Sequence, residues 1–196
     1  FKINGVDFPA SDDWLAEEAA SGSNLEGEAG LAEAVVEAMT VAAAAYLASN
    51  CEFFVIHGVT SLHSVLVTME FLPLAAQVLL LRHWWRAAMA TLVSTGLQGH
   101  AKLADMLNTW HSQRIAGSDG CSAPVLSMES DPWWINALEK AITSTDEHPA
   151  KAVYVLWRWS LFAGMPQCSI DIFKAAAASQ LRTNDKGGPE GNMYFA

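Results

Sequence analysis

The sequence predicts an all-α protein, an irregular multi-helix bundle, on three observations. First, 52% of the 196 residues are apolar and only 16% are charged, so a chain of this length can bury a sizeable core. Second, apolar residues recur at three- and four-residue steps over most of the chain, which is the period of an α-helix with a buried face. Third, a strand-like pattern is confined to residues 51–56, and no internal repeat is visible.

The individual helices follow from this periodicity and from residues that begin or end helices. Helices are predicted over residues 12–20, 31–49, 60–70, from 73 to about 94, 100–115, from 132 past 141, from 149 to 162, and 169–181, with a loop over 116–130. Thr60 and Asp131 are expected to be N-caps, and Pro132 follows Asp131 at the first helical position. Pro73 is expected to end one helix and Gly164 another.

Composition divides the chain into three parts. We expect residues 1–30 to be mostly acidic loop, residues 31–182 to form the helical domain, and residues 183–196 to form a flexible tail. The most apolar stretch, residues 71–93, holds two arginines and a histidine, which favours a buried core helix over a membrane span. The chain opens on Phe1 without a basic leader, and we expect a cytoplasmic protein.

Charge and motif content exclude several classes of function. A net charge of −10 repels phosphate backbones and anionic lipid, so no nucleic-acid or membrane partner is expected. The sequence has no GxGxxG after a strand, no GxxxxGK[ST], no HExxH and no GxSxG, which removes dinucleotide, P-loop, zincin and hydrolase-elbow interpretations. The three cysteines form no CxxC pair and are expected to be free thiols.

The first informative motif is HGVTSLH at residues 57–63. His57 and His63 are six positions apart, which on one continuous helix places them about 120° apart. If Thr60 is the N-cap, His57 lies in the turn before the helix and His63 in its first turns, and both imidazoles can reach one point. The alternative is a pair of structural histidines that are hydrogen-bonded to the backbone.

The second motif is DEHPAK at residues 146–151. Pro149 is expected to set the helix start, with His148 at the cap and Lys151 at about the third helical position, on the same side. A lysine ammonium opposes the helix dipole there, and one interpretation is a solvated Lys151 beside two acids. The other is a lysine carbamate, an anion that can bind a metal as a carboxylate does.

Together, HGVTSLH and DEHPAK, with the apolar helix that ends at Gly164, resemble the questin oxidase family of fungal secondary metabolism. The resemblance runs from about Phe53 to Gly164. Relatives in this family include Baeyer–Villiger-type oxidases of aflatoxin biosynthesis and non-haem iron dioxygenases that open anthraquinone rings. The resemblance implies a helical, flavin-free oxygenase.

The resemblance also implies the site and its cofactors. The implied cofactors are Fe(II) and O₂, with NADPH in some family members. The candidates for catalysis and for metal binding are His57, His63, His148 and Lys151, with Lys151 as a carboxylated lysine. The implied reaction is oxygen-dependent ring cleavage or Baeyer–Villiger-type oxidation of an anthraquinone or related aromatic polyketide, a small-molecule partner. Three imidazoles and an anionic oxygen suit iron.

The length leaves alternatives open. Family members are usually about twice as long, so the chain resembles a C-terminal portion, and the missing N-terminal half is expected to be needed to complete the site. One alternative is a truncated, catalytically inactive helical remnant that binds a hydrophobic metabolite or a partner protein. Another is a plain α-helical interaction domain whose histidines are structural.

Aromatic residues carry a further expectation. Adjacent side chains on a helix point about 100° apart. In each of the pairs Trp84–Trp85 and Trp133–Trp134, one ring is therefore expected in the core and the other at a cleft, where a flat polycyclic substrate could stack. The remaining histidines, His83, His100 and His111, are expected to be structural.

Overall fold

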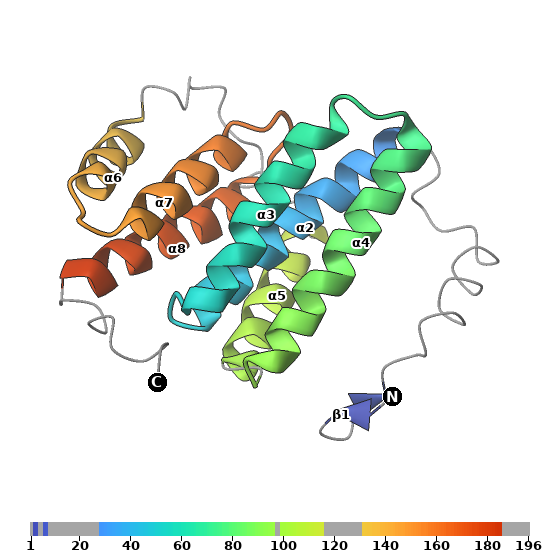
Figure 1. The fold of residues 1–196 in the computed structure, drawn as a ribbon, viewed down its shortest axis with the longest axis horizontal. Helices are drawn as coiled ribbons and strands as arrows, with labels where there is room; N and C mark the ends of the chain where they lie inside the picture. The colour runs from blue at the N-terminus through green and yellow to red at the C-terminus, as the bar shows by residue number, and fades with distance from the viewer. Residues whose placement is uncertain (1, 4–5, 8–27, 97–98, 116–130, 186–196) are drawn as a thin grey trace. The chain divides into compact units, whose positions relative to one another are not determined.

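The structure is a computed structural model that describes residues 2–3, 6–7, 28–96, 99–115 and 131–185. It confirms the all-α prediction (Figure 1). The chain divides into two compact units, Phe1–Val35 and Val36–Ala196. The described part of the first unit is an antiparallel pair of two-residue strands, β1 (Lys2–Ile3) and β2 (Val6–Asp7), together with the beginning of α2.

Seven helices are described, and the second unit holds most of them. They are α2 (Glu28–Ala48), α3 (Phe53–Met69), α4 (Leu74–Ser94), α5 (His100–Ile115), α6 (Pro132–Ile142), α7 (Glu147–Ser160) and α8 (Gln167–Asp185). These helices match the predicted ones except at the start of α3 and, by a few residues, at other ends. The helix predicted over 12–20 and the loop over 116–130 lie outside the described residues.

The predicted start of α3 at Thr60 is wrong, as is the strand-like interpretation of residues 51–56. Helix α3 begins at Phe53, because the Glu52 carboxylate accepts hydrogen bonds from the backbone N–H groups of Phe54 (2.7 Å) and Val55 (3.1 Å). Thr60 lies inside the helix, where its hydroxyl donates to the Ile56 carbonyl at 3.2 Å. The motif HGVTSLH is therefore continuous helix and not a turn followed by a helix.

The buried centre of the second unit is the part of α2 from Val36 onward. Thr40 and Tyr46 on this helix are fully buried. The hydroxyls of Thr40 and Ser169 of α8 are hydrogen-bonded at 2.9 Å, and Ser169 also accepts from Trp110 Nε1 of α5 at 2.9 Å. Tyr46 Oη donates to Gln180 Oε1 further along α8. Because these groups are buried, each needs its partner, and the bonds fix α2, α5 and α8 in register.

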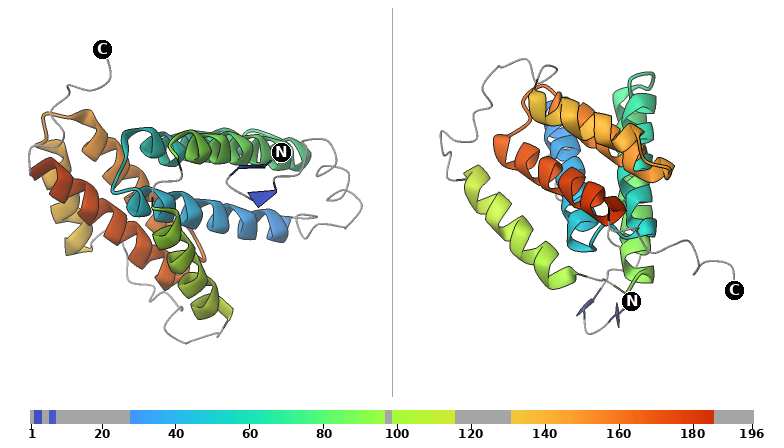
Figure 2. Two further views of the ribbon diagram at one scale, coloured as in Figure 1. Left: turned by 90° about the horizontal axis from the view of Figure 1, so that it is seen from below. Right: turned by 90° about the vertical axis from the view of Figure 1, so that its left-hand side faces the viewer.

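Helix α7 packs on three neighbours, α3, α6 and α8, with its most extensive contact on α8 (Figures 1 and 2). The face that it buries contains Ala152, Val153, Val155, Leu156 and Trp159. The Trp159 ring meets Phe173 of α8 edge to face, with centroids 5.8 Å apart. The opposite face of α7 is left for polar residues, and the candidate site lies there.

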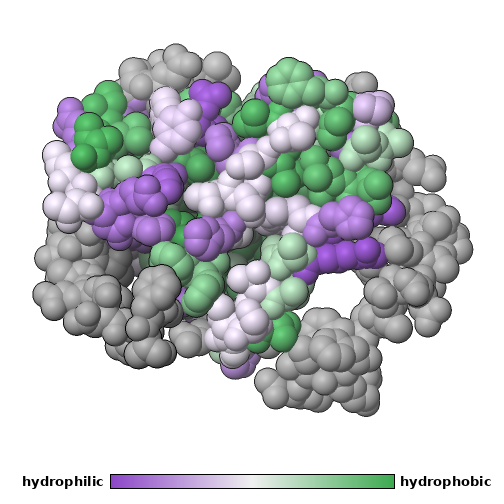
Figure 3. Space-filling view, in the orientation of Figure 1, coloured by the Kyte–Doolittle hydropathy of each residue, from purple (hydrophilic) through white to green (hydrophobic). Residues whose placement is uncertain are grey.

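Helix α4 is an outer helix, which corrects the expectation of a buried core helix over residues 71–93. It packs on α3 and buries only Leu81 and Trp84. Figure 3 shows apolar surface where α3 ends and α4 begins, and Phe71 in this turn is 82% exposed. Among the described helices, the one with the length and hydropathy of a membrane span is Ala29–Ala48, and 67% of its apolar window is buried inside the protein.

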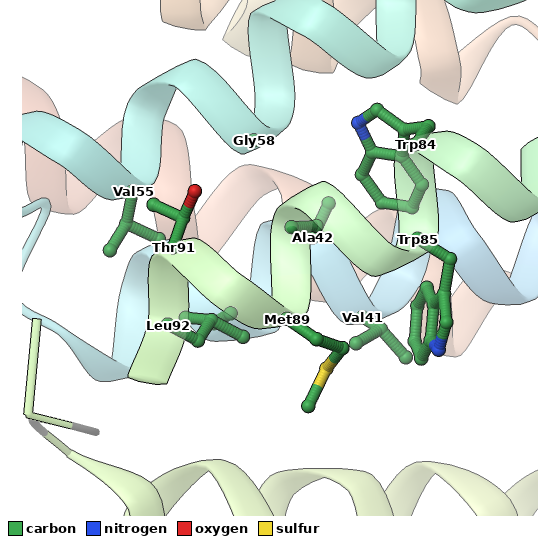
Figure 4. Close-up of a pocket in the computed structure, with 11 residues that line it drawn as sticks. Val41, Ala42, Val55, Gly58, Trp84, Trp85, Met89, Thr91 and Leu92 are labelled. Carbon is green, nitrogen blue, oxygen red and sulfur yellow. The ribbon is translucent and has the colours of Figure 1, made fainter. Parts of the chain in front are cut away.

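A small apolar cavity of about 30 Å³ lies between α2, α3 and α4 (Figure 4). Trp84 points toward α3, where its Nε1 donates to Ser61 Oγ at 3.1 Å, and Trp85 points to the other side. The cavity has room for about one water molecule. A polycyclic substrate does not fit there.

The described cysteines, Cys51 and Cys168, are free as predicted, and Cys121 lies outside the described residues. Burial raises the pKa of the Cys51 thiol, although the neighbouring hydroxyls of Ser179 and Tyr46 partly offset this effect. The thiol is thereby kept in its protonated, weakly nucleophilic form.

Two glycines should respond oppositely to alanine. Gly99, at φ +75°, precedes α5, and an added Cβ would lie 2.1 Å from the Ala48 carbonyl oxygen. Gly58 lies within α3 and an added Cβ would meet nothing within 4 Å. We expect Gly99→Ala to lower the free energy of unfolding by roughly 1–3 kcal/mol, and Gly58→Ala to raise it by roughly 0.5–1 kcal/mol. Urea unfolding measures both, and a destabilised Gly58→Ala variant would contradict the continuous α3.

Candidate functional site

The candidate site lies where α3 and α7 pack side by side in the same chain direction. The His57 ring of α3 lies 6.5 Å from the His148 ring of α7, centroid to centroid. Six residues later on both helices, the His63 ring lies 6.1 Å from the Tyr154 ring. Because the second pair lies six residues after the first on both helices, α3 and α7 run parallel. The register between the two helices determines which of the predicted residues come into contact.

His57 and His148 form the core of the site. Their rings are nearly perpendicular, at 79°. Phe53 of α3 contacts both, with its ring centroid 5.3 Å from that of His57 and 4.9 Å from that of His148. Phe53 is 40% exposed and His57 is also exposed, so this three-ring cluster is open to a ligand.

Asp146 fixes the orientation of His148. One of its carboxylate oxygens, Oδ1, accepts from the His148 backbone N–H at 3.0 Å and lies 2.6 Å from the ring nitrogen Nδ1. Burial alone would raise the pKa of Asp146, but these two hydrogen bonds outweigh it and hold the pKa below its usual value. An ionised carboxylate can only accept, so Nδ1 carries the proton. In the neutral imidazole, the other ring nitrogen, Nε2, is then the atom that can accept a proton or bind a metal.

The start of α7 differs from the prediction in one respect. Asp146 is the N-cap and the helix begins at Glu147, so Pro149 is the third helical residue and not the first. Lys151 is then the fifth, one turn after Glu147. Its ammonium pairs with the Glu147 carboxylate at 2.7 Å, and the two side chains are 53% and 69% exposed. This geometry is that of the solvated lysine beside acids. The carbamate alternative stays a prediction.

His63 occupies a second position on the same helix pair. It lies about 9 Å further along α3 than His57 and about 120° around the axis. Its ring is half-buried against Tyr154. Burial lowers the pKa of His63, and the nearby Arg158 guanidinium lowers it further. These effects favour the neutral form of His63, and its ring lies apart from the His57–His148 pair.

A shared iron centre would need its ligands to converge on one point, because metal–nitrogen bonds are about 2.0–2.1 Å long. Of the four predicted ligands, the structure brings together His57 and His148, and places His63 and Lys151 elsewhere. Within the described ranges, no group of three or more His, Cys, Asp or Glu side chains could hold a metal ion. The four residues as arranged here do not fit a single iron site.

Several neighbours of the site were missed in the sequence. Phe53 stands four residues before His57, a spacing that places both on one face of a helix. Asp146 stands two residues before His148, the spacing of a carboxylate N-cap. Both spacings would have identified these neighbours if the starts of α3 and α7 had been predicted correctly. The contact of Tyr154 with His63 depends on the α3–α7 register and has no sequence signal.

Aromatic side chains continue the site along α7. The Tyr154 ring lies 5.9 Å from Trp157, and the Arg158 guanidinium lies 5.9 Å from the Trp157 ring centroid. The predicted division of the tryptophan pairs is observed: Trp84 and Trp134 are buried, while Trp85 is half-buried and Trp133 is 36% exposed. The histidines expected to be structural, His83, His100 and His111, are exposed on α4 and α5.

Comparison with known proteins identifies a family that the chain resembles over most of its length. A protein family described as questin oxidase-like matches residues 10–156, which is more than half of the chain. The matched range includes His57, His63, Asp146, His148 and Lys151. Neither the curated proteins nor the solved structures contain a significant match.

The Lys151–Glu147 ion pair makes a direct prediction about carbamate formation. The Glu147 carboxylate, which pairs with the Lys151 ammonium at 2.7 Å, would repel an anionic carbamate at the same position. With isotope-labelled bicarbonate, we expect NMR of the protein to show no carbamate signal that disappears in Lys151→Arg. Glu147→Gln serves as the comparison, since it removes the opposing charge. A Lys151-dependent carbamate in the unmodified chain would restore Lys151 as a ligand candidate.

Proposed function

The chain belongs to the questin oxidase-like family, and from this premise we propose that it oxidises an anthraquinone or a related aromatic polyketide in secondary metabolite biosynthesis. Membership supports an oxidase-type function in general. The proposed reaction is oxygen-dependent ring cleavage or Baeyer–Villiger-type oxidation. The observation that carries the proposal is the Asp146-oriented His148 facing His57 in an exposed aromatic cluster.

His148 supplies the base that such a substrate needs. With Nδ1–H held by Asp146, Nε2 can accept the proton of a phenolic hydroxyl, and the Asp146 carboxylate stabilises the imidazolium that results. The phenolate is richer in electrons than the phenol and reacts more readily with an oxidant. His57, across the cluster, can donate a hydrogen bond to an oxygen of the same substrate.

The next turns of the site can position a flat molecule. Phe53 at one end and Tyr154 at the other are both partly exposed, at 40% and 46%. Aromatic rings of a polycyclic substrate stack well on such side chains. Arg158 adds a positive charge beside Tyr154 and Trp157, which favours a substrate in its anionic form.

The two reactions differ in their electron balance. Ring cleavage by dioxygenation places both atoms of O₂ in the product and needs no external reductant. Baeyer–Villiger-type oxidation inserts one oxygen atom next to the carbonyl, and two electrons, from NADPH, reduce the other to water. The proposal does not assign an iron ion to this site, because the described residues do not bring its predicted ligands together. Metal analysis of the purified protein tests whether iron binds.

A second candidate function follows from this incomplete ligand set. His63 and Lys151 lie apart from the His57–His148 pair. This separation is compatible with a catalytically inactive remnant, because binding of a hydrophobic metabolite or a partner protein does not require the four residues to converge. This candidate predicts binding of aromatic compounds without oxygen consumption.

The test is oxygen uptake with a panel of hydroxylated anthraquinones, with and without NADPH and added iron. We expect uptake with at least one compound. Asp146→Asn and His148→Gln should each reduce the rate about 10²–10⁴-fold, the usual contribution of a positioned acid or base. His111→Ala, which removes an exposed histidine on α5, is the matched control and should leave the rate unchanged.

Product mass distinguishes the two reactions, since dioxygenation adds two oxygen atoms and Baeyer–Villiger-type oxidation adds one. If no compound supports uptake but several bind, the inactive-remnant candidate replaces the proposal. Full activity in His148→Gln would reject the assigned role of the site while leaving the oxidase function standing.

A further inference from the structure

A groove lies between α6 and α8 and shares no residue with the α3–α7 site. Its volume is about 560 Å³, within the roughly 300–1,000 Å³ typical of small-molecule sites. The lining residues are Pro132, Trp133, Asn136, Ala137 and Lys140 of α6, and Ala178, Leu181 and Arg182 of α8. We propose that this groove binds a planar aromatic anion, a compound that carries a carboxylate or phenolate on one or two fused rings.

The charge of the groove is opposite to that of the chain. The protein carries a net charge of −10, yet the groove is lined by two cations, Lys140 and Arg182, and by no acid. Among the residues that the structure describes, neither side chain has an ion-pair partner. Two cations that line one groove of an acidic protein select for an anion.

The aromatic half of the recognition comes from Trp133, which is 36% exposed. Two neighbours order the Trp133 ring. The fully buried Trp134 ring meets it edge to face, with ring centroids 4.7 Å apart, and the Lys174 ammonium lies 5.5 Å from the Trp133 ring centroid. Lys174 is itself fixed by the Asp131 carboxylate at 2.8 Å. A ring that is already ordered loses little conformational entropy when a ligand stacks on it.

The remaining lining supports a flat and partly apolar ligand. Ala137, Ala178 and Leu181 offer small apolar surfaces from both helices, and the Asn136 amide can both donate and accept a hydrogen bond. A neutral aromatic compound would leave the two cations without a partner. An aliphatic acid would leave Trp133 without a stacking partner. The groove therefore requires both features in one ligand.

The experiment uses naphthoate as the probe, with naphthamide as its neutral analogue and octanoate as its aliphatic analogue. Titration of the full chain is followed by NMR of the tryptophan indole N–H groups at low salt. We expect the Trp133 indole resonance to move and the dissociation constant of naphthoate to be at least about tenfold lower than that of either analogue. Equal binding of naphthamide would overturn the proposal.

Variants locate the site. Lys140→Gln and Arg182→Gln should each weaken naphthoate binding by roughly fivefold, the effect of one exposed charge. Lys102→Gln on α5 removes a cation of the same kind elsewhere and should have no effect. Trp133→Leu should abolish binding; if that variant does not fold, the two charge variants decide. Unchanged binding in the Lys140→Gln/Arg182→Gln double variant overturns the proposal.

This inference is independent of the oxidase proposal. His148→Gln should leave naphthoate binding unchanged, whereas the double charge variant should leave oxygen uptake unchanged. Loss of both properties in either variant would mean that the two sites are not separate, which would contradict the inference.

Discussion

The parallel packing of α7 on α3 is the constraint on which the candidate site depends. One face of α7 carries Val155, Leu156 and Trp159 into the core, and burial of this face fixes the rotation of the helix. The residues of α7 that border α3 can then align with α3 in a single register. This register places His148 beside His57 and Tyr154 beside His63. A rotation of either helix by one residue, about 100°, would separate both pairs.

The same constraint explains why four candidate residues do not make one centre. Six residues along a continuous helix carry His63 to a different side of α3, and Lys151 finds its partner Glu147 one turn back on its own helix. Of the four candidates, His57 and His148 are the two that face each other across the interface, while His63 faces Tyr154. The site is thus a two-histidine cluster with a carboxylate behind one imidazole, an arrangement suited to proton transfer.

Much of the fold was predictable because its signals are local. The apolar period, Pro73 and the Asp131–Pro132 cap each act within one or two turns, and the corresponding helices were found. The start of α3 was missed because Glu52, an uncommon N-cap residue, caps it after a turn in which Asn50 and Cys51 adopt positive φ. Of the site, the two motifs could be located, but the register between α3 and α7 is set by packing of residues about ninety positions apart, which one sequence does not reveal.

The central claim is that His57 and His148 act as one unit on one substrate. A double-mutant cycle on the turnover of a dihydroxyanthraquinone tests it most directly, with His57→Ala, His148→Ala and the double variant. Groups that act as a unit are strongly non-additive, so the double variant should lose no more activity than the more damaged single variant. Losses that multiply, or a loss in His63→Ala as large as that in His148→Ala, would contradict the account.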